Sequence, residues 1–261
     1  METPAYTVSE LMACVFSRDM QDGERGGIPG VRSEVPLASA GLAVRLHAPN
    51  ATIFSPSGPV AAEQLVMTGT TTDYERTTGV ASMIALDEIF DLIHRGTFDW
   101  WFAGGMQIDQ YGNINLVGIG DWKRPKLRGP GTAGIASENF VGRILVWINE
   151  HSPRMFVKKV DFVSCAGHGP HDRKALGLRG GGPYLVVSPL AVLDFEKKSG
   201  RMRLRSVHPG VTVKQVQENT DFELIIPENV PTTPPPSDEE ITILRKQVDP
   251  LGILREEELY G

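Results

Sequence analysis

The segment from Ser55 to Gly58 is the first place where the sequence suggests chemistry. A short apolar run at residues 52–54 leads directly into Ser55-Pro56-Ser57-Gly58, which has the composition of a tight turn. In α/β enzymes, ligands bind beyond the ends of strands. This turn offers two hydroxyls but no carboxylate, thiol or imidazole. Because a serine without an adjacent base is a weak nucleophile, and because the sequence has no GxSxG elbow, a Ser-His-Asp hydrolase is not predicted.

Residues 102–134 form a second candidate segment, rich in glycine and short polar side chains. Glycine allows a backbone to approach a ligand closely, and such loops often carry binding residues. Hairpin turns account for its first half equally well, but they account less well for the loop at residues 131–134. The predicted ligand-binding residues are Gly104, Gly105, Gln107, Asp109, Asn113, Gly131, Thr132, Ala133 and Gly134.

Other familiar sites are not supported. The sequence has no GxxxxGK[ST] loop, and no GxGxxG follows a predicted strand. His168, His171 and Asp172 lie in a glycine- and proline-containing loop without a specified third ligand, so no metal site is predicted. Cys14 and Cys165 lack CxxC spacing, which argues against a disulfide framework and fits a reducing compartment.

The composition indicates a soluble globular protein. The 261 residues are 41% hydrophobic and 22% charged, enough to bury a substantial core. The formal net charge of −6 argues against nucleic-acid or anionic-membrane partners. The sequence shows neither a signal peptide nor a transmembrane span, so a cytoplasmic location is expected.

Periodicity and turn signals give the elements that would position these residues. The apolar patterns predict helices over 7–18, 36–46 and 82–94, and strands over 52–54, 98–103, 144–148, 159–164 and 184–188. Residues 190–195 and 202–207 are expected to form an antiparallel hairpin. A capping box at 237–240 opens a final helix. We therefore predict an α/β fold with an open, mostly parallel sheet and an antiparallel edge. One α/β domain is expected over 1–230, and 231–261 form a proline-rich linker and a helix packing on that domain.

Longer motifs carry a resemblance that covers essentially the whole chain. They are FAGGMQIDQYGNINLVGIGD, RMFVKKVDFVSCAGHG, LGLRGGGPYLVVS, LDFEKKSGRM and VDPLG. They resemble the β subunits of family I CoA transferases, in the glutaconate CoA-transferase group of the NagB/RpiA/CoA-transferase superfamily. The resemblance implies helices on both faces of the sheet and an α-type partner subunit, in a heterodimer or heterotetramer. It also implies an acyl-CoA substrate and no cofactor beyond the CoA that the substrate carries.

The chain departs from this family in the turn of residues 55–58. In the family, the turn after the strand carries a glutamate that attacks the thioester; here the corresponding residue is Pro56. A proline has no side-chain group that could form an anhydride or a thioester. Glu34 and Ser57 are the candidate catalytic residues in its place, with Glu34 projecting into the same pocket. Backbone N–H groups of residues 131–134 are expected to stabilise developing oxyanion charge.

The loss of the glutamate decides which reaction we expect. Within the resembled family, one subgroup without this glutamate opens a carbon ring in steroid catabolism, using a carboxylate of the α subunit. Carbon–carbon bond hydrolysis of an acyl-CoA is therefore the leading interpretation. The alternatives are a true CoA transferase that uses another carboxylate, an acyl-CoA decarboxylase, and a non-catalytic acyl-CoA-binding or scaffold subunit. The decarboxylase type places a cysteine in this turn, and this chain has none there.

Overall fold

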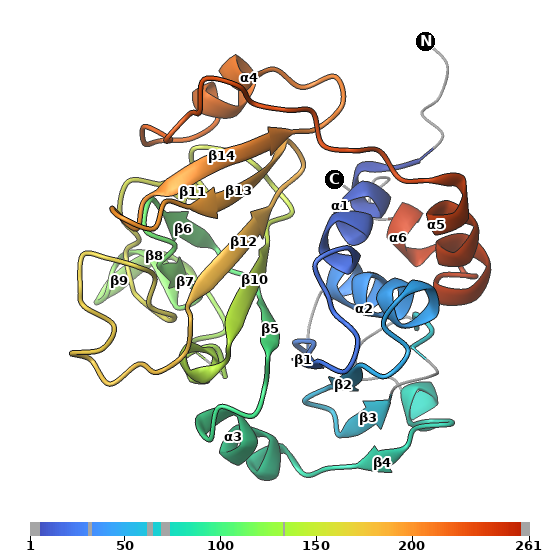
Figure 1. Ribbon diagram of the computed structural model, residues 1–261. Coiled ribbons are helices and arrows are strands. Elements are labelled where there is room, and N and C mark those ends of the chain that lie inside the picture. The colour runs from blue at the N-terminus through green and yellow to red at the C-terminus, as the bar shows by residue number, and fades with distance from the viewer. Residues whose placement is uncertain (1–5, 31–32, 62–64, 69–73, 133, 257–261) are drawn as a thin grey trace. The chain divides into compact units, whose positions relative to one another are not determined.

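The computed structural model describes residues 6–30, 33–61, 65–68, 74–132 and 134–256 (Figure 1). Contacts within the chain separate it into two compact units. Unit 1 comprises residues 1–92, 98–102 and 235–261, and unit 2 comprises residues 93–97 and 103–234. Unit 1 is thus assembled from segments far apart in the sequence. Among the described residues, no helix is long and apolar enough to cross a membrane.

Unit 1 contains a sheet with parallel strands and an antiparallel edge. Its strands are β1 (Arg25–Gly27), β2 (Thr52–Phe54), β3 (Pro59–Ala61), β4 (Ser82–Met83) and β5 (Trp100–Ala103). Their order is β5-β1-β2-β3-β4. β1 pairs in parallel with β2 and β5, whereas β3 pairs antiparallel with both β2 and β4. The hairpin formed by β2 and β3 carries the turn at residues 55–58.

Two glycines make β1 possible. A β-carbon on Gly26 would lie 2.0 Å from the Trp100 ring, and one on Gly27 would lie 1.9 Å from the Trp101 ring. Both indoles are buried, and the Trp101 ring meets Phe98 edge-on at 5.0 Å. The tryptophans of β5 therefore occupy the space that side chains of β1 would fill. This close approach explains why a glycine pair, unusual in a strand, lies there.

The helices of unit 1 come from both the N-terminal and the C-terminal parts of the sequence. They are α1 (Val8–Ser17), α2 (Glu34–Leu46), η1 (Tyr74–Thr77), α3 (Leu86–His94, at the boundary with unit 2), α5 (Asp238–Ile243), η3 (Leu244–Val248) and α6 (Ile253–Glu256). Arg18, after α1, forms a two-point ion pair with Glu240 of α5 at 2.7 Å for each contact. Arg245 of η3 pairs in the same way with Glu10 of α1, at 2.7 and 2.8 Å.

Unit 2 also combines parallel and antiparallel strands. β10 (Arg143–Trp147) and β12 (Pro183–Val187) are parallel, and β13 (Ala191–Phe195) and β14 (Met202–Val207) extend the sheet antiparallel in the order β14-β13-β12-β10. A smaller sheet has the order β11 (Phe156–Val157), β6 (Gln107–Asp109), β7 (Ile114–Asn115). β8 (Gly118–Asp121) and β9 (Arg124–Arg128) form a separate hairpin, and η2 (Ser137–Phe140) and α4 (Val213–Glu218) complete the unit.

The structure confirms the α/β fold with parallel strands and antiparallel edges. The hairpin of β13 and β14 is confirmed, as are the N-terminal helix and the capping box, in which the Ser237 hydroxyl accepts from the Glu240 N–H. The C-terminal helices pack on α1 and α2 of unit 1. The helix expected from residue 82 begins at Leu86, because Ser82 and Met83 pair with β3 instead.

The strand predicted over residues 159–164 is wrong. These residues form bends and loop in the structure. Asp161 accepts a hydrogen bond from the Gly120 N–H at 2.9 Å, and the Ser164 hydroxyl accepts from the Leu116 N–H at 3.0 Å. Short polar side chains that bond to neighbouring backbone in this way compete with the regular ladder of a sheet.

Candidate functional site

The turn at residues 55–58 closes the hairpin between β2 and β3. The Ser55 N–H donates to the Pro59 carbonyl at 3.1 Å, and the Gly58 N–H donates to the Ser55 carbonyl at 2.9 Å. Pro56 thus occupies the second position of a four-residue turn, which its fixed φ favours. Gly58 has a φ of +107°, and a β-carbon there would lie 2.9 Å from the Met83 side chain. Proline and glycine are therefore accounted for by the turn itself.

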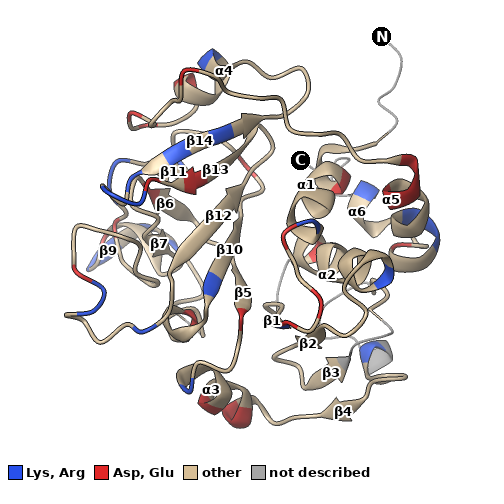
Figure 2. Ribbon diagram, in the orientation of Figure 1, with Lys and Arg blue, Asp and Glu red and all other residues tan. Residues whose placement is uncertain are grey.

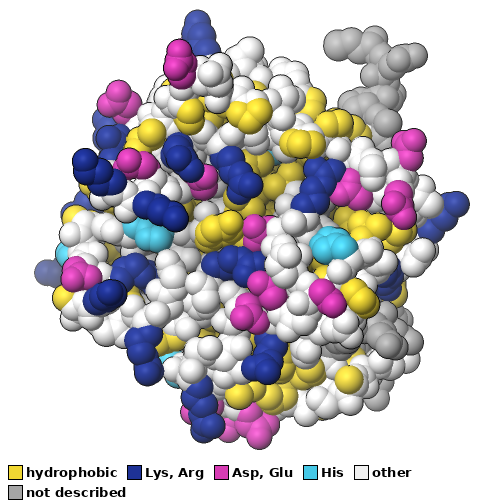
Figure 3. Space-filling model, viewed as in Figure 1, with side chains coloured by type: hydrophobic (Ala, Val, Ile, Leu, Met, Phe, Trp, Pro, Cys, Tyr) yellow, Lys and Arg dark blue, Asp and Glu magenta, His cyan; other side chains and the backbone are white. Residues whose placement is uncertain are grey.

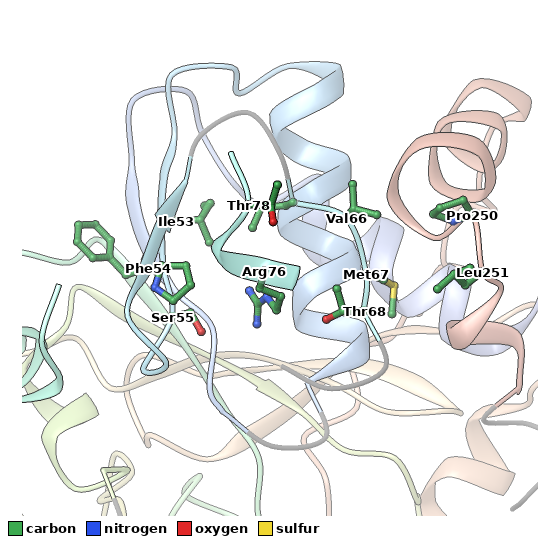
Figure 4. Close-up of a pocket in the computed structure, with 12 residues that line it drawn as sticks. Ile53, Phe54, Ser55, Val66, Met67, Thr68, Arg76, Thr78, Pro250 and Leu251 are labelled. Atoms are coloured by element: carbon green, nitrogen blue, oxygen red, sulfur yellow. The ribbon is translucent and has the colours of Figure 1, made fainter. Parts of the chain in front are cut away.

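A cavity of about 440 Å³ in unit 1 lies beside this turn (Figure 4). Ser55, only 2% exposed, lines it, whereas Ser57 is exposed and its hydroxyl lies 2.9 Å from that of Ser55. No carboxylate is present among the described residues that line the cavity. The lining residues are Ile53, Phe54, Ser55, Pro59, Leu65, Val66, Met67, Thr68, Arg76, Thr78, Pro250 and Leu251. The wall is thus apolar, with three hydroxyls and one cation.

Arg76 supplies the positive charge of this cavity, and the sequence analysis did not identify it. Figure 4 shows it extending from η1 between the end of β2 and the segment that carries Thr68. A guanidinium is suited to bind a carboxylate or a phosphate at two points. No local motif marks Arg76, because the cavity is assembled from segments around residues 54, 67, 76 and 250.

Glu34 lies at the first position of α2 and is half-buried. A carboxylate there interacts favourably with the positive end of the helix dipole, which gives Glu34 a structural reason to be present. It is not among the described residues that line the cavity. Its catalytic role, like that of Ser57, stays a prediction.

In unit 2, the predicted polar binding residues form two buried hydrogen-bond groups. Both Asp109 oxygens accept from the Asn113 side-chain amide, at 3.1 and 3.0 Å, and Asp109 Oδ1 also accepts from the Tyr111 N–H. The Asn115 amide donates to Gln107 Oε1 at 2.7 Å. Burial raises the pKa of Asp109, despite these hydrogen bonds. The structure therefore brings Gln107, Asp109 and Asn113 together in the β6–β7 region, where they hold the backbone in place.

The predicted glycines differ in whether a side chain would fit at their positions. A β-carbon on Gly104 would lie 2.8 Å from the Trp147 ring, and one on Gly105 would lie 2.4 Å from Ile114, so packing within unit 2 requires both. Gly131, with a φ of +95°, has open space on the side-chain face. Its N–H donates to the Leu116 carbonyl at 3.3 Å, and its role in stabilising an oxyanion stays a prediction. Thr132 and Gly134 lead into η2, and Ala133 lies outside the described residues.

Glu138 of η2 is a second residue that sequence reasoning missed. It is 5% exposed, and its Oε2 has no hydrogen-bond partner among the described residues. Burial raises the pKa of Glu138 well above the ordinary value of 4.5. A buried carboxyl with a perturbed pKa next to a predicted ligand loop is a functional candidate. Nothing in the local sequence distinguishes it from a surface acid.

We expect Glu138→Gln to change how stability depends on pH. A carboxyl whose folded-state pKa is raised is neutral in the folded protein but ionised in the unfolded chain, so stability falls as pH rises above 4.5. This loss is at most about 1.4 kcal/mol per pH unit. Urea unfolding at pH 5 and pH 8 measures the free energy of unfolding. Relative to the wild type, the variant should be more stable at pH 8 than at pH 5. The exposed Glu218→Gln variant is the control, and equal gains in both variants would contradict the prediction.

The described residues contain no cluster of three His, Cys, Asp or Glu side chains that could hold a metal ion. His168 Nε2 lies 2.6 Å from the Pro183 carbonyl, so this imidazole is engaged as a hydrogen-bond donor, and His171 is exposed.

Residues 17–219 match the family model described as Coenzyme A transferase. The chain therefore belongs to the coenzyme A transferase family. It is 33% identical to one of the subunits of 3-oxoadipate CoA-transferase from Pseudomonas knackmussii, over 92% of this chain and 93% of that protein. It is 33% identical to the cholesterol ring-cleaving hydrolase IpdB subunit of Rhodococcus jostii, over 64% and 65% of the two chains.

Solved structures agree with this assignment. The chain superposes on glutaconate coenzyme A-transferase from Acidaminococcus fermentans with a TM-score of 0.86 and 28% identity, over 95% of this chain and 96% of that one. It superposes on IpdAB of Rhodococcus jostii with a TM-score of 0.83 and 26% identity, over 97% and 98%. The decarboxylase AibA/AibB shares the fold, with a TM-score of 0.83 at 24% identity over 95% and 97%.

Proposed function

We propose that this chain is the β-type subunit of a heteromeric enzyme that hydrolyses a carbon–carbon bond of an acyl-CoA. The observation that carries the proposal is the cavity beside the Ser55–Gly58 turn, whose described lining offers hydroxyls and a guanidinium but no carboxylate. Transfer of CoA through a covalent intermediate needs a carboxylate on the protein. Hydrolysis does not, because water is the nucleophile.

A partner subunit completes the reaction. A carboxylate of an α-type partner would act as the general base and take a proton from water. The water oxygen then attacks a ring carbonyl carbon, the adjacent carbon–carbon bond breaks, and its electron pair passes to the departing carbon, which is protonated. In this proposal, the Ser55 and Ser57 hydroxyls, 2.9 Å apart, would orient this water, and Arg76 would bind an anionic group of the substrate. CoA is part of the substrate, and no further cofactor is needed.

Two relatives support the heteromeric and hydrolytic parts of the proposal. The name of the IpdB subunit describes a ring-cleaving hydrolase, and the solved structure of IpdAB contains this subunit type with its partner. The competing proposal is CoA transfer. It is favoured by the wider coverage of the 3-oxoadipate transferase relative, 92% of this chain against 64% for IpdB, and it would require Glu34 or a partner carboxylate as the nucleophile.

The two proposals predict different products. The purified complex of this chain with its α-type subunit is incubated, in heavy-oxygen water, with a cyclohexanedione carried on propanoyl-CoA. Hydrolysis yields a ring-opened acyl-CoA with one heavy oxygen in the new carboxylate. Intact-mass analysis of both subunits detects a covalent CoA adduct, and glutaconate CoA-transferase is the positive control. A CoA adduct on this chain, with no ring-opened product, would overturn the hydrolase proposal.

A further inference from the structure

The hairpin of β8 and β9 in unit 2 carries an unusual surface for an acidic protein. Trp122 at its turn is 67% exposed, and Leu127 is 55% exposed. Four cationic side chains accompany them within seven residues, and all four are exposed. They are Lys123, Arg124, Lys126 and Arg128. Figure 2 shows this basic character along β9, and Figure 3 shows Lys and Arg side chains over the face of unit 2 that carries β14.

The charges of these cations are not neutralised by the acidic side chains that the structure describes. In the part of the chain that the structure describes, none of the four forms an ion pair. Asp121 is the acid of the hairpin, and its Oδ1 accepts a hydrogen bond from the Lys123 backbone N–H at 2.7 Å. Four like charges, Lys123 in the turn and the other three on β9, repel one another and favour an anionic ligand. The hairpin surface therefore carries positive charge that an anionic ligand would neutralise.

Trp122 provides a second kind of recognition. Its indole meets the Phe162 ring at 5.5 Å and an interplanar angle of 61°, a contact that leaves most of the ring surface exposed. Exposed aromatic rings beside basic side chains are typical of sites that stack a nucleobase and bind its phosphates. The combination favours a nucleotide over a simple anion.

The backbone fixes this surface. The Gly120 N–H donates to Asp161 Oδ2 at 2.9 Å, which ties β8 to the neighbouring loop. The register shifts at this point, and Gly120 has a φ of +96° against the Lys126 backbone. At the other end, the Gly129 N–H donates to the Val117 carbonyl at 2.8 Å. The hairpin is thus held at both ends of its ladder.

We infer that this hairpin binds the nucleotide end of the acyl-CoA, with Trp122 stacking on adenine and the β9 cations neutralising the phosphates. The inference rests on the proposed acyl-CoA function. β9 runs directly into the glycine loop at 129–134, and its five residues span about 17 Å at about 3.4 Å per residue. The extended pantetheine arm can run along this strand.

The test uses the complex of both subunits and two probes. Adenosine bisphosphate, the nucleotide end of CoA, is titrated by calorimetry and by tryptophan fluorescence. Trp100, Trp101 and Trp147 are buried, and quenching that is lost in Trp122→Phe is assigned to Trp122 rather than to a tryptophan of the partner subunit. Trp122→Ala is expected to weaken binding about tenfold, and Trp122→Phe to recover part of the loss because a stacking ring is kept. Lys126→Ala should weaken binding and lower its salt dependence. Lys198→Ala, which removes an exposed cation in the β13–β14 turn, should change neither.

Turnover measurements distinguish a failure of this inference from a failure of the proposed function. With acyl-CoA, Trp122→Ala should lower kcat/KM about tenfold, whereas acyl-pantetheine, which lacks the nucleotide, should be turned over equally by variant and wild type. Unchanged nucleotide binding in Trp122→Ala and Lys126→Ala would overturn the inference and leave the acyl-CoA function standing. Dissociation of the two subunits in these variants would overturn it in favour of a partner contact. A wild-type complex that binds no CoA would overturn both.

Discussion

Replacing Gly27 with alanine is expected to destabilise unit 1 by about 3 kcal/mol or more. The added β-carbon would lie 1.9 Å from Trp101 Cε3, far inside van der Waals contact. Trp101 has no free space to move into, because it is 3% exposed and packs against Phe98. Overpacking of a core typically costs about 1–3 kcal/mol, and here both the ring and a paired strand must shift. Urea unfolding measures the effect as a lower midpoint.

Gly30→Ala is the matched control for this prediction. It lies three residues further along the same segment, and a β-carbon there meets nothing within 4 Å. This substitution should change the free energy of unfolding by no more than about 0.5 kcal/mol. If Gly27→Ala unfolds at the same urea concentration as Gly30→Ala, the packing of β1 against the tryptophans is not as described.

Removing Arg245 is expected to cost about 3 kcal/mol at neutral pH. Its partner Glu10 is 1% exposed, and the variant Arg245→Ala would leave that carboxylate buried without its cation. Burial raises the pKa of Glu10, but the hydrogen bonds from Arg245 and from the Thr7 N–H outweigh this and hold it below 4.5. The ion pair therefore stabilises the protein above pH 4.5, and its contribution is lost as pH falls below that value.

The pH profile distinguishes this effect from simple loss of packing. The difference in unfolding free energy between wild type and Arg245→Ala should be largest at pH 7 and shrink toward pH 4, because a protonated Glu10 needs no cation. Arg154→Ala breaks an exposed pair, with side chains 81% and 49% exposed, and should cost less than about 1 kcal/mol. A deficit for Arg245→Ala that is the same at pH 4 and pH 7 would contradict the electrostatic explanation.

The local residue pattern was sufficient to predict the helices and strands that bury one regular face. The helix of residues 8–17 and the strands from Arg143 and Pro183 carry their apolar periodicity in their own residues. β1 does not. Arg25-Gly26-Gly27 has the composition of a loop, and it is a strand because Trp100 and Trp101, more than seventy positions later, fill the glycine side. Pairing between distant segments is not encoded in either segment alone.

The candidate site shows the same division. Ser55, Pro56 and Gly58 could be assigned to a turn from their types alone, and the structure places them in one. Arg76 could not be found in this way, since it reaches the cavity only through the packing of η1 near Ser55 and Leu251. For Gln107, Asp109 and Asn113, the sequence identified buried polar residues but not their hydrogen-bond partners: Asp109 accepts from Asn113, whereas Gln107 donates to Asp161 and accepts from Asn115.

The return of the chain to unit 1 has a consequence for its order of synthesis. The ion pairs Arg18–Glu240 and Arg245–Glu10 join residues separated by 222 and 235 positions. A ribosome therefore releases all of unit 2, residues 93–97 and 103–234, before α5 and η3 emerge. Unit 2 can acquire its fold during translation, whereas the faces of α1 and α2 that α5, η3 and α6 cover stay uncovered until these three helices are made. Until then, chaperones and proteases can reach those faces.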